Sequence, residues 1–434
     1  MTDEAIKNIY TLFLKSTGVS TDTRKIDEGK IYFALKGPNF NGNTFAQKAL
    51  EQGALCCVID EPQQPTSDKF ILVEDVLTAL QSLANYHRKH LNIPVLGITG
   101  SNGKTTSKEL CAAVLSKKYK TLFTQGNLNN HIGVPLTLLQ INKQHEFAVI
   151  EMGANHQGEI DFLSSICEPT HGFITNVGKA HLEGFGGFEG VIKGKTELYR
   201  FLMQSGGTIF CNSDNPFLFP LCKDYDKLIT YGSNNKASVF GEALDGEYLS
   251  VNWKDAEGNL IKKIKTQLTG SYNLENVLAA ICIGKTFGVS NNDIQTAIET
   301  YAPSNQRSQV MQKGSNTLII DAYNANPTSM IAALKNLGNA YKGKKVIVLG
   351  DMFELGDESY IEHKHVLHEA INLKPDLLLL VGKWFNEVDK DKKGIHFTNS
   401  VEAKDYLKSN LPANSTVLIK GSRSSKMEEV LEAF

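Results

Sequence analysis

A glycine-rich stretch lies between an apolar run at 93–96 and a helical pattern at 107–115. It reads Gly97-Ile98-Thr99-Gly100-Ser101-Asn102-Gly103-Lys104-Thr105-Thr106. A strand, a glycine turn and a helix in this order point backbone N–H groups and the positive end of the helix dipole at an anion. Lys104 can then reach the outer phosphates of a nucleotide, and Thr105 can offer its hydroxyl to Mg²⁺. The stretch therefore predicts a site for a nucleoside triphosphate.

This prediction has one plain alternative, a glycine turn ahead of an ordinary helix. The general phosphate-loop pattern places a glycine six residues before the lysine, where this chain has Ile98. The strand and the helix on either side still favour a phosphate loop. The predicted ATP-binding residues of this stretch are Gly100, Ser101, Asn102, Gly103, Lys104, Thr105 and Thr106.

Length and composition set outer limits on the class of protein. A chain of 434 residues predicts roughly three domains of about 150 residues each. The net charge of -2 gives no reason to expect nucleic acid or a membrane surface as partner. No apolar run is long enough to span a bilayer, and the first residues show no signal-peptide pattern, so we expect a cytoplasmic protein. Six of the seven cysteines lie in apolar runs, which predicts small buried side chains in a reducing compartment (Cys56, Cys57, Cys111, Cys167, Cys211 and Cys282).

The order of apolar runs and helical patterns predicts an α/β protein of three domains. Residues 1–90 read as a small α/β unit with polar loops at strand ends. Residues 91–304 alternate strands with helices, which is typical of a parallel sheet covered on both faces, with a β-rich insertion at 237–268. Residues 305–434 read as a second doubly wound, Rossmann-like domain.

A phosphate loop needs a divalent ion, and four residues are considered for holding it or assisting it. Glu151 ends the apolar run 147–150, although any apolar strand can end in a charge. His181 follows a strand and a glycine, yet a lone loop histidine is usually only solvated. Lys193 and Lys195 fall on a helical pattern, where lysines are typically exposed.

Several polar strings elsewhere have both a structural and a functional interpretation. Asn129 and Asn130 could simply bond their own loop, and Asn273 could cap the helix that follows it. Residues 318–327 predict a strand, a polar loop and a helix starting at Pro327. Three histidines at 363, 365 and 368 suggest a metal site, but a solvated helix accounts for them better because no matching cysteine or acid accompanies them.

These strings together resemble the Mur ligase and folylpolyglutamate synthase superfamily, ATP-dependent enzymes that join an amine to a carboxylate. The resemblance rests on T-G-x-N-G-K-T-T at the loop, E-M-G-A after Glu151, N-V-G-x-A-H-L-E around His181 and the K-x-E-L that begins at Lys195. It implies that Thr105 and Glu151 bind a first Mg²⁺, and that His181 and a carbamylated Lys195 bind a second. It also implies catalytic roles for Lys104, His181 and Lys195, and ATP contacts from Asn273, Arg307 and Asp321.

The first domain resembles the part of these ligases that binds the UDP moiety of the substrate. The resemblance lies in T-D-T-R-K followed by F-A-L-K-G, and it extends to N-x-N-N-x-x-G-x-P in the second domain. The implied UDP-substrate residues are Thr21, Asp22, Thr23, Arg24, Asn129 and Asn130.

The third domain resembles one branch of the family, the MurF type. Its strings are D-x-Y-N-A-N-P, G-D-M-x-E-L-G and K-G-S-R-x-x-x-M-E. This branch adds D-alanyl-D-alanine to UDP-N-acetylmuramoyl-tripeptide in peptidoglycan precursor synthesis, and the resemblance implies that Tyr323, Asn324 and Asn326 face the dipeptide. We expect a monomer. The alternatives are another amide ligase of the superfamily, or a P-loop ATPase that uses hydrolysis to drive a conformational change.

Overall fold

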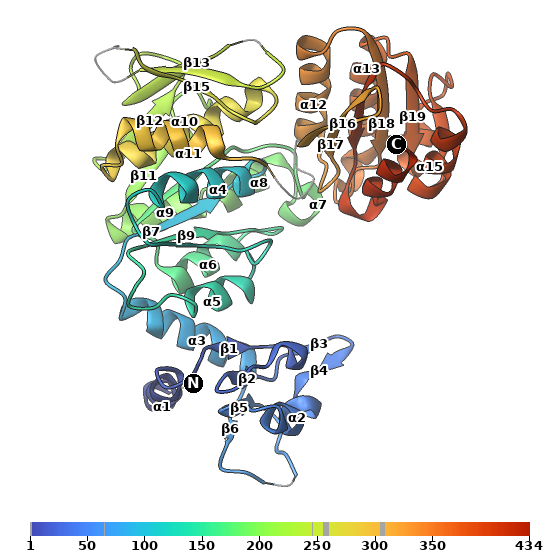
Figure 1. Cartoon of the computed structure of the whole chain (residues 1–434). Helices are drawn as coiled ribbons and strands as arrows, with labels where there is room; N and C mark the ends of the chain where they lie inside the picture. Colours follow the sequence, from blue (N-terminus) through green and yellow to red (C-terminus); the bar gives the residue numbers. More distant parts are fainter. Residues whose placement is uncertain (1, 65, 245, 255–259, 304–308) are drawn as a thin grey trace.

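The computed structural model describes residues 2–434 except 65, 245, 255–259 and 304–308. Three α/β lobes follow one another along the chain, with the N-terminal lobe below the central one and the C-terminal lobe beside it (Figure 1). Within the described residues, no helix combines the length and the apolar character that a bilayer crossing requires.

The N-terminal lobe has a four-stranded parallel sheet in the order β1-β2-β5-β6. Tyr32 and Phe33 of the central strand β2 are buried, which explains why this short apolar run forms a strand. A small hairpin of β3 and β4 extends from it. The elements are α1 (Asp3–Phe13), β1 (Val19–Ser20), β2 (Ile31–Phe33), β3 (Lys36–Gly37), β4 (Phe40–Asn41), α2 (Ala46–Glu51), β5 (Cys56–Ile59), β6 (Phe70–Leu72) and α3 (Val76–Lys89).

The central lobe has a nine-stranded sheet in the order β15-β14-β13-β12-β11-β10-β7-β9-β8. Strands β7 to β12 run parallel, whereas β13, β14 and β15 pair antiparallel at one edge. The strands are β7 (Val95–Thr99), β8 (Thr121–Phe123), β9 (Phe147–Glu151), β10 (His171–Ile174), β11 (Thr208–Asn212), β12 (Leu228–Gly232), β13 (Val239–Leu244), β14 (Ser250–Lys254) and β15 (Leu260–Lys265). The β-rich segment predicted as an insertion therefore extends the main sheet, because β13 pairs with β12.

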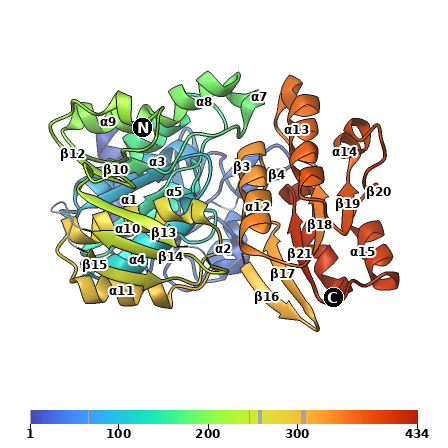
Figure 2. The same cartoon turned by 90° about the horizontal axis from the view of Figure 1, so that it is seen from above.

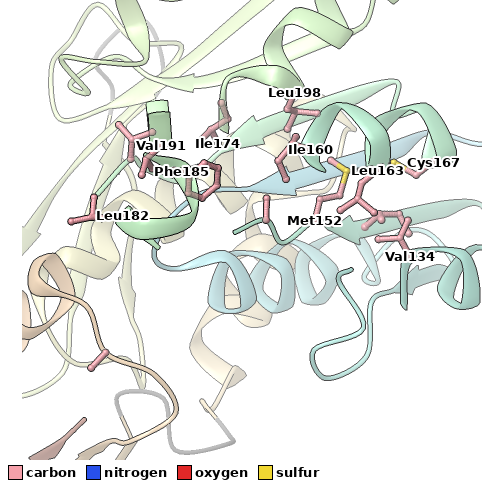
Figure 3. Close-up of a cluster of buried hydrophobic side chains, with 14 of the residues drawn as sticks. Val134, Met152, Ile160, Leu163, Cys167, Ile174, Leu182, Phe185, Val191 and Leu198 are labelled. Atoms are coloured by element: carbon pink, nitrogen blue, oxygen red, sulfur yellow. Dashed lines mark hydrogen bonds between the residues drawn. The ribbon is translucent and has the colours of Figure 1, made fainter. Parts of the chain in front are cut away.

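Helices cover both faces of the central sheet, as the runs of buried apolar strand residues require. One face packs against α4 (Lys104–Leu115), α10 (Leu274–Thr286) and α11 (Asn291–Thr300). The other face carries α5 (Gly133–Leu138), α6 (Glu159–Cys167), α8 (Phe188–Lys195) and α9 (Glu197–Ser205), with the short α7 (Leu182–Phe185) at its rim. Figure 3 shows part of this second core, in which Met152 lies beside Leu163 and Phe185 lies beside Val191.

The C-terminal lobe has a six-stranded sheet in the order β16-β17-β21-β18-β19-β20, parallel except for the edge strand β16. Its strands are β16 (Gln309–Lys313), β17 (Asn316–Asp321), β18 (Lys344–Gly350), β19 (Leu377–Val381), β20 (Ile395–Phe397) and β21 (Ser415–Lys420). Its helices are α12 (Pro327–Ala340), α13 (Ser359–Asn372), α14 (Lys383–Val388) and α15 (Ser400–Ser409). Seen from above, α12 lies between this sheet and the central lobe (Figure 2).

These lobes confirm the predicted three-domain α/β class. The limits at 90/91 and 304/305 stay a prediction, and α3 shows why the first is hard to draw. His87 and Arg88 of α3 bond the carbonyls of Ile141 and Cys167, in the central lobe, at 2.8 and 2.9 Å. All seven cysteines are free and buried, as predicted for six of them.

Candidate active site

The glycine-rich stretch forms a loop between β7 and α4, at the carboxyl end of the parallel sheet. Gly100 has φ +142°, and an added Cβ would meet Thr175 Oγ1 at 2.0 Å, so only glycine fits there. Gly103 has φ +78° and precedes Lys104, the first residue of α4. The loop thus presents a helix N-terminus to the adjoining cavity, as an anion site requires.

A side chain from the neighbouring strand fixes the loop. Asn176 follows β10, and its amide accepts from the Asn102 N–H at 3.0 Å and donates to the Asn102 carbonyl at 3.2 Å. Lys104 Nζ donates to the Gly100 and Ser101 carbonyls at 2.6 and 3.1 Å. Thr105 and Thr106 continue the loop into the first turn of α4.

Thr105 and Glu151 form the first pair predicted for a metal. Strands β7 and β9 are neighbours, so Glu151 at the end of β9 lies beside the start of α4. Thr105 Oγ1 donates to Glu151 Oε2 at 3.0 Å, and Asn129 Nδ2 donates to Glu151 Oε1 at 2.8 Å. Mg²⁺ prefers hard oxygen ligands, so this hydroxyl and carboxylate fit the ion chemically.

Lys195 is buried, so its interpretation from sequence position as an exposed helical lysine is wrong. It ends α8, only 1% exposed, and its Nζ donates to the Ala154 carbonyl at 2.9 Å and lies 4.9 Å from the centre of the Phe185 ring. Burial and the neighbouring Lys104 hold the pKa of Lys195 well below its ordinary value. This shift raises the share of the neutral, nucleophilic amine at any given pH.

His181 lies at the rim of the cavity, immediately before α7. Buried Leu182 and Phe185 hold this short helix in the core (Figure 3). His181 adopts φ +54°, and its Nδ1 contacts a carboxylate oxygen of Glu354 in the C-terminal lobe. Lys195 thus lies behind the cavity wall, whereas His181 is part of the wall.

The C-terminal lobe supplies the opposite wall. Asp321 and Lys420 end the adjacent strands β17 and β21, and their side chains form an ion pair. Asn326 precedes α12 and donates to Asn102 Oδ1 at 2.7 Å, while Tyr323 and Asn324 lie in the loop between β17 and α12. The predicted helix start at Pro327 is confirmed.

One cavity of about 850 Å³ brings these elements together. Its lining includes all the predicted loop residues except Gly100, with the other predicted site residues Asn129, Asn130, Glu151, His181, Asn273, Asp321, Tyr323, Asn324 and Asn326. The structure supports a role within its own loop for Asn130, but it does not support a side-chain cap for Asn273. Asn130 Oδ1 accepts from the Gly133 N–H of its own loop, and Asn273 precedes α10 without a side-chain cap bond.

The UDP-substrate residues of the N-terminal lobe lie apart from this lining. Thr21 and Asp22 follow β1. Arg24 pairs with the Asp22 carboxylate at 2.8 Å, and its hydrogen bonds lower the pKa of Asp22 to about 2. Thr23 begins the 3-10 turn beside them. Arg307 falls outside the described residues. In the described part of the chain, no cluster of three or more His, Cys, Asp or Glu side chains is arranged to hold a metal ion.

Four residues in or near the cavity could not be assigned from the sequence. Lys420 and Asn176 belong to the motifs K-G-S-R and N-V-G-x-A-H-L-E, but their contacts depend on strand neighbours that only the fold reveals. Glu275 bonds Asn176, and buried Lys108 lies 3.7 Å from Glu151 Oε2, which a helical lysine pattern does not indicate.

The interpretation of the three histidines needs a correction. His363 is fully buried, where it accepts from the Met352 N–H at 2.9 Å, because α13 packs on the loop after β18. His365 and His368 are exposed, as predicted.

Three α/β lobes around a phosphate loop, with a carboxylate and a hydroxyl beside it, define a nucleotide-dependent enzyme that works between two domains. Sequence profiles identify its kind. The Mur ligase family catalytic domain matches residues 15–88, the Mur ligase middle domain 98–284 and the Mur ligase glutamate ligase domain 306–423. The chain belongs to the Mur ligase family, in its MurF branch, and is an ATP-dependent ligase.

Individual relatives are similar to this chain over nearly its whole length. The UDP-N-acetylmuramoyl-tripeptide–D-alanyl-D-alanine ligase of Bacillus subtilis is 35% identical over 96% of this chain and 92% of its own length. The Escherichia coli ligase of the same name is 35% identical over 96% and 93%. A crystal structure of MurF from Acinetobacter baumannii has a TM-score of 0.88 at 31% identity, covering 99% and 98%. MurF from Thermotoga maritima in complex with ADP has a TM-score of 0.87 at 26% identity, covering 100% and 98%.

Proposed function

We propose that this enzyme adds D-alanyl-D-alanine to UDP-N-acetylmuramoyl-tripeptide at the expense of ATP. The substrates come from the names of its relatives. The observation that carries the proposal is the shared cavity in which the loop residues Lys104 and Thr105 face Asp321 and Asn326 of the other lobe. An amide-forming enzyme needs this arrangement, because phosphate, acid and amine must meet in one place.

The reaction requires activation of the acid, since a carboxylate has no leaving group. A carboxylate oxygen of the tripeptide attacks the γ-phosphorus of ATP, which forms an acyl phosphate and releases ADP. The free amine of the dipeptide then attacks the acyl carbon, the amide bond forms and inorganic phosphate leaves. Charge on the transferring phosphoryl group is what the protein must stabilise, and Lys104 is proposed to do this with the α4 N-terminus.

Thr105 and Glu151 are proposed to hold a first Mg²⁺, and His181 and Lys195 a second. When bound, such ions supply positive charge at the phosphate oxygens. Lys195 fits only after modification, because an ammonium would repel the ion. Its neutral amine adds to CO₂, forming a new N–C bond and releasing one proton, and the resulting carbamate offers anionic oxygens.

The remaining assignments stay proposals of the same kind. Asn273, Arg307 and Asp321 are assigned to ATP, whereas Tyr323, Asn324 and Asn326 are assigned to the dipeptide side. Thr21, Asp22, Thr23, Arg24, Asn129 and Asn130 are assigned to the UDP substrate. The monomeric state and the cytoplasmic location likewise stay predictions.

The test is phosphate release measured with UDP-N-acetylmuramoyl-tripeptide, with and without D-alanyl-D-alanine. We expect sustained release only with both substrates, and transfer of ¹⁸O from the tripeptide carboxylate into the released phosphate. A different amine requirement would favour another ligase of the family. Phosphate release that ignores both substrates would instead indicate a simple ATPase.

A further inference from the structure

The contact between His181 and Glu354 joins two lobes at the rim of the active site. Nδ1 of His181 contacts a Glu354 carboxylate oxygen, and the Glu183 N–H donates to the Glu354 carbonyl at 3.2 Å. Glu354 therefore contacts the segment around His181 through both its side chain and its backbone.

Both residues are held in a costly backbone conformation. His181 has φ +54° and Glu354 has φ +61°, the left-handed region that residues other than glycine rarely adopt. Such conformations are strained and persist only where the surroundings enforce them. Two of the seven non-glycine residues with positive φ in the described part of the chain therefore meet at this contact between the lobes.

Neighbouring contacts show that the whole segment is docked on the C-terminal lobe. The Lys179 N–H donates to Thr328 Oγ1 at 3.1 Å, and the Lys179 ammonium pairs with Glu362, whose side chain is only 3% exposed. Lys179 also lies 3.8 Å from Glu358. His181 accordingly faces Glu354 from a segment that is held at both ends.

We propose that Glu354 is a positioning residue that orients His181 for its metal ion from across the domain joint. A carboxylate only accepts, so its contact places the imidazole proton on Nδ1 and leaves the Nε2 lone pair for a metal. Histidine ligands commonly have such a carboxylate on their other nitrogen. The inference rests on the proposed metal role of His181, and it makes the second ion site complete only when the C-terminal lobe is docked.

The first readout needs no metal. In ¹⁵N-histidine spectra of the full-length protein at pH about 9, above the ordinary imidazole range, His181 should be protonated on Nδ1. His181→Gln identifies its signals by their loss. Glu354→Ala should move the proton to Nε2, whereas Glu358→Gln, which changes an acid 3.8 Å from Lys179 on the same segment, should leave the spectrum of His181 unchanged.

The second readout is Mn²⁺ binding to the ADP complex. Glu354→Ala should weaken the weaker of two Mn²⁺ sites by about 10- to 100-fold and leave the tighter site and ADP affinity unchanged. Glu354→Gly provides a second variant that removes the carboxylate where glycine is the residue best suited to the backbone. It should fold at least as well as Glu354→Ala and show the same loss.

Both readouts must change together for the inference to stand. An unchanged tautomer, an unchanged weaker site, or only one Mn²⁺ site in the wild type would each overturn it. The proposed function is judged separately, by dipeptide-dependent phosphate release from the wild-type enzyme. An active wild type with unaffected Glu354 variants would thus remove this inference and leave the ligase assignment in place.

Discussion

The side-chain amide of Asn326 donates to Oδ1 of Asn102 across 2.7 Å, and this hydrogen bond ties the start of α12 to the phosphate loop. The same Asn326 side chain accepts from the Ser329 N–H at 2.9 Å and so caps α12. Asn326 therefore both caps the N-terminus of α12 in the C-terminal lobe and contacts the phosphate loop of the central lobe. The position of α12 is coupled to the loop through this residue.

We predict that Asn326→Ala loses stability and activity, whereas a matched cap variant loses only stability. Asn399 caps α15 in the same way, because its side-chain oxygen accepts a hydrogen bond from the Glu402 N–H at 3.1 Å. This bond lies entirely within the C-terminal lobe. Each alanine should cost about 1 kcal/mol of unfolding free energy in denaturant titrations. Only Asn326→Ala also breaks the bond to Asn102, and one lost hydrogen bond of about 1 kcal/mol lowers kcat/KM for ATP about fivefold. Equal kcat/KM in the two variants would contradict the coupling.

Lys104→Ala should remove nearly all ATP consumption while leaving UDP-substrate binding nearly intact. Removing a preorganised charge from a transferring phosphoryl group costs about 10²- to 10³-fold in kcat. Four of the six UDP-substrate residues, 21–24, are assigned to the N-terminal lobe, so the Kd for UDP-N-acetylmuramoyl-tripeptide, measured by calorimetry, should stay close to that of the wild type. Lys117→Ala, an exposed lysine just beyond α4, is the control. Loss of both ATP consumption and UDP-substrate binding in Lys104→Ala would argue against the assignment of these two roles to different lobes.

The sequence was sufficient where local pattern decides structure. The strand, glycine turn and helix around Lys104 were predicted correctly, because a turn that needs positive φ at Gly100 and Gly103 leaves a local signature. Glu151 was correctly placed at a strand end for the same reason. The three-lobe α/β class followed from the alternation of apolar runs and helical patterns.

What the sequence could not predict depends on which elements become neighbours. Lys195 and His363 were both expected at the surface from their helical positions, yet packing by other segments buries them. The interaction of Glu275 with Asn176 joins residues 99 positions apart, and that of His181 with Glu354 joins residues 173 apart. No local periodicity encodes such contacts, since the sheet order and the docking of the lobes create them.

Lys195 should carry a carbamate in solution, whereas Lys193 on the same helix should not. The Lys195 amine is buried with a lowered pKa, so its neutral form is available to CO₂, while the Lys193 side chain is exposed. In protein equilibrated with ¹³C-bicarbonate, NMR should show a carbamate carbon that Lys195→Arg removes and Lys193→Arg retains. Lys195→Arg should also lose most of its ligase activity, because the guanidinium keeps its charge and cannot form the carbamate. Retention of the signal in Lys195→Arg would contradict the assignment.

Glu275 should make the stability of the enzyme depend on pH. Its carboxylate accepts from Asn176 Nδ2 at 2.8 Å and Asn212 Nδ2 at 3.3 Å, yet burial, aided by Asp214, raises the pKa of Glu275 to about 7. Between its ordinary pKa and about 7, the folded protein holds a proton that the unfolded chain has released. The unfolding free energy must therefore fall as pH rises through this window, by up to about 3 kcal/mol.

Glu275→Gln isolates this effect because it removes the titrating group and nearly keeps the shape. Urea titrations between pH 5 and 8 should show the unfolding free energy of the variant rising relative to that of the wild type as pH increases. Asp293→Asn, which replaces an exposed acid in the first turn of the neighbouring α11, should show a smaller trend. The amide of Glu275→Gln also places a donor opposite Asn176 or Asn212, so the variant should be the less stable protein at pH 5. A relative stability that does not change with pH would mean that Glu275 is already ionised throughout this range in the folded enzyme.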